Sequence, residues 1–159
     1  MATQLELARG GTITPQMQTV ARIEQVPPEA VRESVARGHA VIPANLKHSE
    51  TCAAAVGRMF RTKVNANIGR SAEHSSSEEE IAKLRVAVAA GADFIMDLSV
   101  GPDLAGLRKA MLEACSVPLG TVPIYEALSR AGGDIGRLNA DLLIDVIREH
   151  AEQGVDFMT

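Results

Sequence analysis

Aromatic residues are scarce in this chain of 159 residues: they make up 3% of it, and tryptophan is absent. Such scarcity argues against a surface that stacks nucleobases and against a large interface built on aromatic anchors. The formal net charge of −4 offers no excess of cations for a phosphate backbone, so we expect no nucleic-acid partner. No apolar run has the length of a bilayer span, so we expect no membrane partner.

Cysteine is nearly absent as well. Cys52 and Cys115 are the only two cysteines, and neither belongs to a CxxC pair. Zinc sites and iron–sulfur clusters need several thiolates or imidazoles at set spacings, so the chain predicts no metal ligand of its own. Both thiols are expected to be reduced and mostly buried. The start MATQLELARGG has no apolar core of the signal-peptide type, and the expected compartment is the cytoplasm.

Nucleotide-binding motifs are missing too, since the chain contains neither GxGxxG after its first strand nor GxxxxGK[ST]. Strand and helix patterns alternate instead. Apolar runs predict strands at TKVNANI (62–68), ADFIMDLS (92–99), VPLGTVPIY (117–125) and VDFMT (155–159). Between them, capped amphipathic patterns predict helices at 76–91, 103–115 and 139–154. Strands that alternate with helices indicate a parallel sheet with crossover connections.

Short helices precede this alternation. Thr14-Pro15 is typical of a helix start, and a second helix is predicted for PEAVRESVARG, which ends at Gly38. HAVIPAN (39–45) then predicts a short strand broken by Pro43. We therefore expect a helical segment over residues 1–38 and a β/α domain over residues 39–159.

The spacing of the strands favours one member of the α/β class. Asn67 and Met96 lie 29 residues apart, and Met96 and Tyr125 are separated by 29 residues again. So regular a repeat fits a β/α barrel better than an irregular doubly wound sheet. The fold class expected is therefore a partial (β/α)8 TIM-type barrel, comprising its first strands and helices.

Polar residues gather where the predicted strands end, which is where a β/α barrel builds its site. They are Asn45 with His48, Asn65 with Asn67, Met96 with Asp97 and Ser99, and Thr121 with Tyr125. Asn65 and Asn67 are two residues apart, so both side chains should face the same side of a strand. This set can hydrogen-bond a polar ligand, but it contains no nucleophile–base pair, so no catalytic residue is assigned.

Each of these residues also has a structural interpretation. An asparagine at a strand end can bond local backbone, and a methionine can fill a core. His48 and His74 are expected in solvated loops. Ser76 or Ser77 is expected to cap the helix that follows, and the start of that helix could also accept an anion.

Six segments, taken in order, resemble one enzyme family. ARGGTITPQM, IPANLKH, KVNANIG, GADFIMDLSVG, VPLGTVPIYEAL and EQGVDFMT are similar to the phosphomethylpyrimidine synthase family, which has 5-hydroxybenzimidazole synthase as a close relative. The resemblance covers essentially the whole chain. It implies a β/α-barrel lyase of thiamine biosynthesis, a radical S-adenosylmethionine enzyme that acts on 5-aminoimidazole ribotide. It also implies three substrate contacts: Asn67, Met96 and Tyr125.

The same resemblance implies cofactors that this chain cannot hold. Members use a [4Fe–4S] cluster on a CxxCxxxxC motif, S-adenosylmethionine and a zinc ion held by two histidines, and they are typically homodimers. The chain has no CxxCxxxxC motif, and Cys52 and Cys115 match no family ligand. We therefore expect a fragment of a longer enzyme, inactive alone, that lacks the C-terminal half of the barrel and the cluster-binding part.

Two alternatives stay open from the sequence. The hydroxybenzimidazole reaction is one, because IPANLKH carries KH where NH is more usual and no long N-terminal extension precedes it. The other is a non-catalytic ribotide-binding or assembly protein. The pyrimidine reaction of thiamine biosynthesis is the first expectation because it is the more widespread activity.

Overall fold

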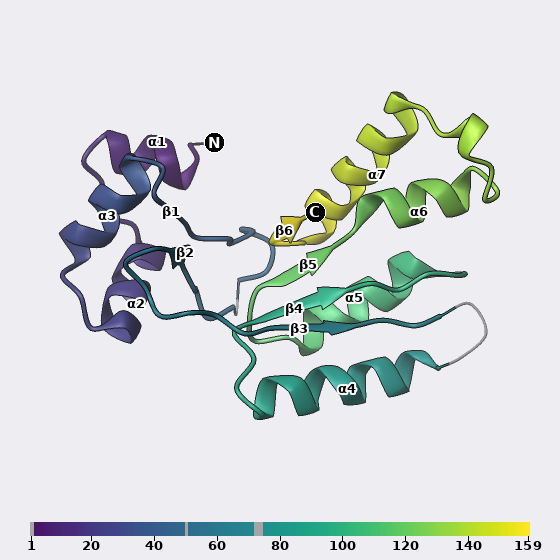
Figure 1. Ribbon diagram of the computed structural model, residues 1–159, viewed down its shortest axis with the longest axis horizontal. Helices are drawn as coiled ribbons and strands as arrows, with labels where there is room; N and C mark the ends of the chain where they lie inside the picture. Colours follow the sequence, from purple (N-terminus) through teal and green to yellow (C-terminus); the bar gives the residue numbers. More distant parts are fainter. Residues whose placement is uncertain (1, 50, 72–74) are drawn as a thin grey trace. The chain divides into compact units, whose positions relative to one another are not determined.

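The computed structural model describes residues 2–49, 51–71 and 75–159. The chain forms two compact units: Met1–Ala44 with Cys52–Lys63, and Asn45–Thr51 with Val64–Thr159 (Figure 1). The expected boundary between a helical segment (1–38) and a β/α domain (39–159) refers to the domains of the complete protein, so it stays a prediction. His74 lies outside the described residues.

Three helices make up most of the first unit: α1 (Gln4–Arg9), α2 (Pro15–Glu24) and α3 (Pro28–Ala36). Thr14 caps α2 as expected, accepting a hydrogen bond from the Met17 amide at 3.2 Å. Helix α1 was not anticipated, although Thr3 and Glu6 form a capping box at its start. The helices share an apolar core that contains Met17, Val20, Val31 and Val35.

The strand expected at residues 39–45 is shorter than the sequence suggested. Only β1 (Ala40–Val41) is extended and paired, and its partner β2 (Val56–Gly57) runs antiparallel to it. Pro43 lacks an N–H and cannot continue a ladder, which accounts for the early end. This strand therefore belongs to a small two-stranded sheet of the first unit and not to the parallel sheet.

A four-stranded parallel sheet forms the second unit. Its strands are β3 (Asn65–Ile68), β4 (Phe94–Asp97), β5 (Leu119–Thr121) and β6 (Phe157–Met158), in the order β3-β4-β5-β6. The connections contain α4 (Ser77–Ala89), α5 (Leu104–Ala114), α6 (Pro123–Arg130), the 3-10 helix η1 (Ile135–Arg137) and α7 (Ala140–Gln153). The expected parallel α/β arrangement is therefore confirmed.

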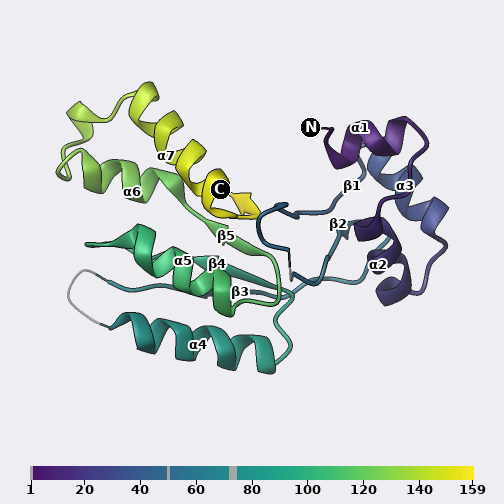
Figure 2. The same cartoon turned by 180° about the vertical axis from the view of Figure 1, so that it is seen from behind.

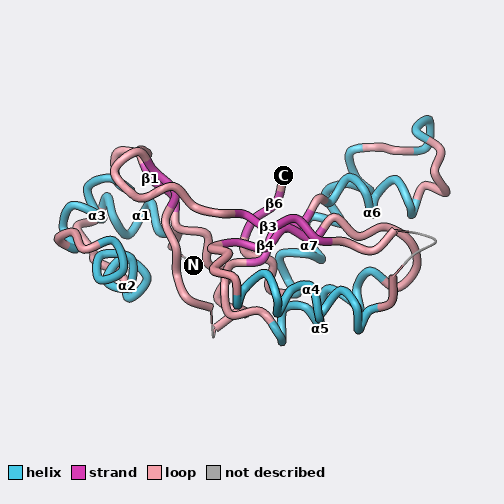
Figure 3. The backbone as a smooth tube through the Cα atoms, turned by 60° about the horizontal axis from the view of Figure 1, so that its bottom comes forward, coloured by secondary structure: helices cyan, strands magenta, loops and turns pink. Residues whose placement is uncertain are grey.

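The helices pack on one face of this sheet. Leu84 of α4 and Leu107 and Met111 of α5 share a buried cluster with Ile95 and Leu119 of the strands. Figures 2 and 3 show α4 and α5 on the same side of β3 and β4. Right-handed crossovers that always step to the next strand place their helices on the same face, which explains this arrangement. The opposite face of the sheet is not covered by α4 or α5.

The local signals that predicted the helices are present in the structure. Ser76 caps α4 in a capping box with Glu79, Asp103 caps α5 and Asn139 caps α7. Gly154 follows α7 in a left-handed conformation (φ 117°), which glycine adopts without a Cβ penalty.

The strand expected over 117–125 is wrong in its second half. Strand β5 ends at Thr121, and Pro123 opens helix α6. Proline fits the first position of a helix, where its missing N–H costs nothing. Tyr125 therefore lies in the first turn of α6 and not at the end of a strand.

Sequential order and parallel direction are those of a β/α barrel, in which each strand pairs with the next along the chain. Four strands do not close a barrel, however. Barrel closure therefore stays a prediction about the complete protein.

Candidate functional site

The sheet face away from the helices carries the first two predicted site residues. Ala66 and Ile68 pack against the helix-side cluster, so Asn65 and Asn67 lie on the other face of β3, where both are exposed. In the register of the sheet, Asn67 lies beside Met96. The structure thus brings Asn67 and Met96 together, as neighbours on adjacent strands.

The two asparagines are bonded to each other. Asn65 Nδ2 donates to Asn67 Oδ1 at 2.7 Å. This bond uses one of the two lone pairs of Asn67 Oδ1, and the Nδ2 group of Asn67 remains a donor. Asn65 therefore orients the Asn67 side chain.

Beside this amide pair lies an apolar patch. Met96 and Phe94 of β4 are both buried, at 8% and 4% exposure. The Phe157 ring meets the Phe94 ring edge-to-face, with centroids 5.6 Å apart. A Cβ added at Gly120 would come within 2.3 Å of the Phe157 ring, so glycine at this position lets the ring lie across β5. The face therefore combines exposed amides on β3 with a buried apolar cluster on β4.

The loops after β3 and β4 are clamped together at the carboxyl ends of these strands. The Leu98 amide donates to the Ile68 carbonyl and the Val100 amide to the Arg70 carbonyl, both at 2.8 Å. A Cβ at Gly69 would lie 2.7 Å from the Leu98 carbonyl carbon, so only glycine permits this approach. The clamp holds the ends of both strands next to Asn67 and Met96.

Tyr125 is placed differently from the other two predicted contacts. It lies in the first turn of α6 and is 42% exposed. It belongs to the carboxyl-end side of β5, because only Val122 to Ile124 separate it from the last residue of that strand. Its place relative to Asn67 and Met96 is therefore set by how helix α6 is held.

Asp97 and Thr121 also lie at carboxyl ends of strands, as expected, but they face the helices. Each is two residues beyond a member of the helix-side cluster, Ile95 or Leu119. Asp97 accepts from the Ser99 amide at 2.9 Å, and burial raises the pKa of this carboxyl. These two residues support the loops and helices and do not line the face with Asn67.

Behind these strand ends lies a buried polar network that sequence reasoning missed. Arg108 of α5, Glu126 of α6 and His150 of α7 are 2%, 7% and 2% exposed. Arg108 Nη1 donates to Glu126 Oε2 at 2.8 Å, and Thr121 Oγ1 lies 2.8 Å from His150 Nδ1. The sequence does contain a sign of this network, since polar residues stand on the apolar stripes of two helices. Glu126 adjoins Ala127, and His150 follows Val146 by one turn.

The electrostatics of this network favour an ionised carboxylate. Burial alone raises the pKa of Glu126, but hydrogen bonds from His150, Arg108 and Arg130 outweigh it and hold the pKa well below its ordinary value. Arg108 Nη2 is buried without a partner among the described residues. Arg108 lines a cavity of about 10 Å³ together with Asp97 and Ser99, which is room for one water molecule.

Asn45 and His48 belong to the opposite end of the sheet, so their expected place at the strand carboxyl ends is wrong. The Asn45 amide donates to Asp156 Oδ1 at 2.8 Å, and His48 Nδ1 lies 2.7 Å from Asp156 Oδ2. Asp156 directly precedes β6 and also accepts from the Leu119 amide, at the start of β5.

His48 is therefore buried, at 8% exposure, and not in a solvated loop. Its Nε2 lies 2.9 Å from the Cys115 carbonyl, which can only accept, so Nε2 donates there. Burial lowers the pKa of His48, but the pair with Asp156 and the carbonyls of Cys115 and Leu112 outweigh burial, and the net pKa is raised. The arrangement stabilises the fold at this end of the sheet.

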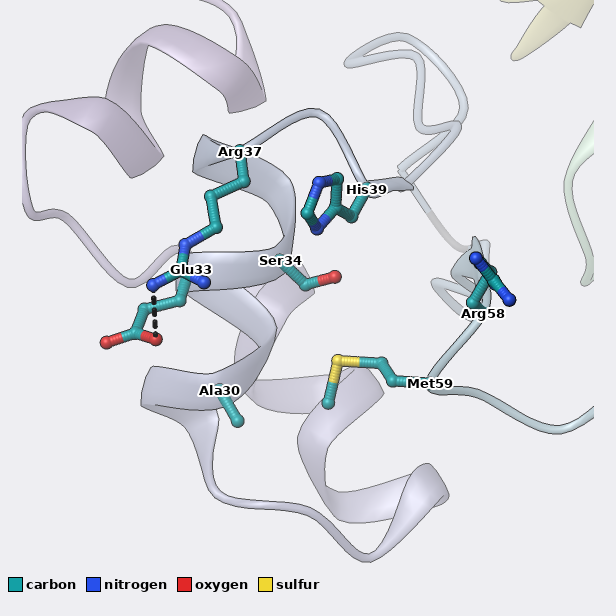
Figure 4. A pocket seen from close by; sticks show the side chains of 7 residues that line it. All are labelled: Ala30, Glu33, Ser34, Arg37, His39, Arg58 and Met59. Carbon is teal, nitrogen blue, oxygen red and sulfur yellow. Dashed lines mark ion pairs between the residues drawn. The ribbon is translucent and has the colours of Figure 1, made fainter.

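The first unit contains a hollow of about 400 Å³. Figure 4 shows the side chains around it, with the ion pair between Glu33 and Arg37 dashed. Arg58 and His39 add cationic and hydrogen-bonding groups, and Met59 adds an apolar one. None of the predicted contact residues lines this hollow.

The described residues do not form a site for an iron–sulfur cluster or a zinc ion, because no group of three or more His, Cys, Asp or Glu side chains converges among them. Cys115 donates to the Val117 carbonyl, and burial raises the pKa of its thiol to about 11, which keeps it protonated. Cys52, in the other unit, is exposed, so the expectation that both thiols are buried is wrong for this residue.

Across the described part of the chain, every helix is too short or too polar to cross a membrane.

Comparison with known proteins agrees with the resemblance. Residues 3–159 match the radical SAM ThiC family. The chain is 52% identical over 159 residues to the phosphomethylpyrimidine synthase of Halobacterium salinarum, covering 100% of this chain and 33% of that protein. It is also 52% identical over 157 residues to that of Haloarcula marismortui, covering 99% and 32%. For Natronomonas pharaonis the identity is 52% over 159 residues, covering 100% and 33%.

The chain thus spans about a third of the length of the curated relatives it matches. The match nevertheless runs along nearly all of this chain. The chain belongs to the radical SAM ThiC family.

Proposed function

We propose that this chain is part of a phosphomethylpyrimidine synthase and supplies one wall of its 5-aminoimidazole ribotide site. The observation that carries the proposal is the identity of 52% over the whole chain to the phosphomethylpyrimidine synthase of Halobacterium salinarum. The complete enzyme would convert the ribotide to the pyrimidine phosphate used in thiamine biosynthesis. It would be a cytoplasmic homodimer and would close the four parallel strands into a β/α barrel.

Three residues of this chain would contact the ribotide. Asn67 would donate a hydrogen bond through Nδ2, since Asn65 already occupies its Oδ1. Met96, beside it in the register, would pack its thioether against the imidazole ring. Tyr125 would hydrogen-bond a polar group of the ribotide through its hydroxyl. The adjacency of an amide donor and a soft apolar side chain on one sheet face supports these roles.

Iron–sulfur chemistry would come from parts of the enzyme outside this chain. The cluster would cleave S-adenosylmethionine and start the radical rearrangement, and a zinc ion would bind separately. The residues described here bind and orient the substrate. Their contribution to the rate is therefore expected through ribotide affinity and placement.

Product analysis tests the proposal. The complete enzyme is reconstituted with iron and sulfide and incubated with the ribotide, S-adenosylmethionine and a reductant. The expected product is the hydroxymethylpyrimidine phosphate. Formation of 5-hydroxybenzimidazole would assign the chain to the related synthase. Ribotide binding without turnover of S-adenosylmethionine would indicate a non-catalytic binding protein.

A further inference from the structure

Helix α6 starts without a side-chain cap. Val122 makes no capping hydrogen bond, and Pro123 is the first helical residue. The buried residues of α6 are Pro123, Glu126 and Ala127, the spacing of an apolar helix stripe. A carboxylate thus occupies a position where an apolar residue would bury the helix at lower electrostatic cost.

Two arginines and a histidine surround that carboxylate, and each comes from a different place. Arg108 Nη1 of α5 donates to Glu126 Oε2 at 2.8 Å. Arg130 Nη2, on α6 itself, donates to Glu126 Oε1 at 2.6 Å. His150 Nε2 of α7 lies 2.8 Å from Glu126 Oε2 and 2.7 Å from Arg108 Nη1. Glu126 is therefore fastened to both helices that flank α6.

The network is anchored to the sheet as well. His150 Nδ1 lies 2.8 Å from the Thr121 hydroxyl at the last residue of β5. Arg108 Nε donates to Gln153 of α7. Hydrogen bonds depend on angle, whereas apolar contacts tolerate sliding and rotation. The network consequently fixes the rotation of α6 about its own axis relative to the end of β5.

Tyr125 directly precedes Glu126. Successive residues of an α-helix are about 100° apart around the axis, so Tyr125 projects away from the buried side and is 42% exposed. A small rotation of α6 sweeps the distant Tyr125 hydroxyl through a larger arc than it moves the backbone. A misplacement of about 1 Å is enough to weaken a directional contact severely.

We propose that Glu126, held by Arg108 and His150, is a positioning residue that sets the place of the Tyr125 hydroxyl in the ribotide site. This inference rests on the proposed function, in which Tyr125 contacts the ribotide. Glu126 itself does not touch the substrate. It acts through the orientation of helix α6.

A double-mutant cycle in the complete enzyme tests this role, with ribotide affinity measured by calorimetry. Glu126→Gln keeps the size of the side chain but replaces one acceptor oxygen by a donor. We expect it to weaken ribotide binding about tenfold in the protein with Tyr125. In a Tyr125→Phe background the same change should alter affinity less than about twofold, because the hydroxyl that it positions is gone.

Glu149 provides a matched control, because it is the exposed carboxylate that pairs with Arg130, as Glu126 does. Glu149 accepts from Arg130 Nη1 at 2.9 Å, and its side chain is 47% exposed. Glu149→Gln should change ribotide affinity less than about twofold. Circular dichroism and hydrogen exchange of α6 would show whether Glu126→Gln remains folded, and Glu126→Asp serves as a second variant with a shortened carboxylate and the same expected coupling.

Two results would overturn the inference, and they are distinguishable. If Glu126→Gln weakens binding by the same factor in both backgrounds, Glu126 is merely structural, and the ribotide site proposed for Tyr125 still stands. If Tyr125→Phe alone leaves affinity unchanged, the contact assigned to Tyr125 in the proposed function fails, and the positioning role fails with it.

Discussion

Asn65 and Asn67 share one sheet face, yet their roles in the proposed site differ. In the proposed site Asn67 donates to the ligand, whereas Asn65 Nδ2 donates to Asn67 Oδ1 at 2.7 Å and orients that amide. The spacing of the two residues predicted from sequence that both would face the same way. Their mutual hydrogen bond required side-chain positions that spacing alone does not determine.

Removing the Asn65 side chain should therefore weaken ribotide binding indirectly, through its effect on Asn67. Asn65→Ala frees the Asn67 amide to rotate and costs about one neutral hydrogen bond, so we expect roughly threefold to tenfold weaker ribotide binding by the complete enzyme. Calorimetric titration measures it. In an Asn67→Ala background the Asn65 change should have no further effect, and a full additional loss would contradict the orienting role.

His48 illustrates what sequence could not reveal at the residue scale. It stands in a polar stretch, which suggested a solvated loop. Its partner Asp156 lies 108 residues further along the chain, and burial follows only when β6 brings Asp156 next to it. No local pattern encodes so distant an ion pair.

The raised pKa of His48 makes the stability of this pair pH-dependent. The folded state holds the proton more tightly than the unfolded state, whose histidine pKa is about 6.5. The stabilisation is therefore complete below that value and is lost as pH rises through the raised pKa.

Hydrogen exchange checks this expectation at the Asn45 and Leu119 amides, which donate to Asp156. Their protection, corrected for intrinsic exchange, should fall with rising pH across this window, and His48→Gln should abolish the dependence. His39→Gln, in the other unit, is the control. Protection that increases with pH would contradict the assigned direction.

At the scale of elements, sequence signals worked where they were local. Caps at Thr14, Ser76 and Asn139 and the glycine after α7 marked helix ends that the structure confirms. The strand predicted over 117–125 was too long at its carboxyl end. Apolar residues lie on both sides of Pro123, and this pattern fits one long strand as well as a short strand followed by a helix. The helix α6 is favoured over a longer strand only by tertiary packing, in which Glu126 and Ala127 are buried against the neighbouring helices.

Helix α4 offers a test of capping with a built-in control. Ser76 accepts from the Glu79 amide at 3.3 Å, and Glu79 accepts from the Ser76 amide at 2.7 Å. Ser76→Ala should cost about 1 kcal/mol and speed exchange of the first-turn amides about fivefold. Ser77→Ala, at the first helical position, should have a much smaller effect. Equal effects of the two changes would rule out the cap.

For the molecule as a whole, the sequence predicted a parallel sheet from alternating strands and helices, and the structure has one in sequential order. Barrel closure could not follow from it, because two of the strands in this chain are edges that need further partners. The metal chemistry could not be predicted from this chain either, because the family resemblance places the metal ligands outside these residues. In the proposed function, this chain contributes the wall formed by β3 and β4.

The most direct test of that contribution is the affinity of the complete enzyme for 5-aminoimidazole ribotide with Asn67 replaced by alanine. The change removes the donor proposed to meet the ribotide and leaves the ligand acceptor unpaired. We expect binding weakened by about tenfold or more in calorimetry, with the fold unchanged by circular dichroism. An affinity equal to that of the unmodified enzyme would contradict the placement of the ribotide on this face of the sheet.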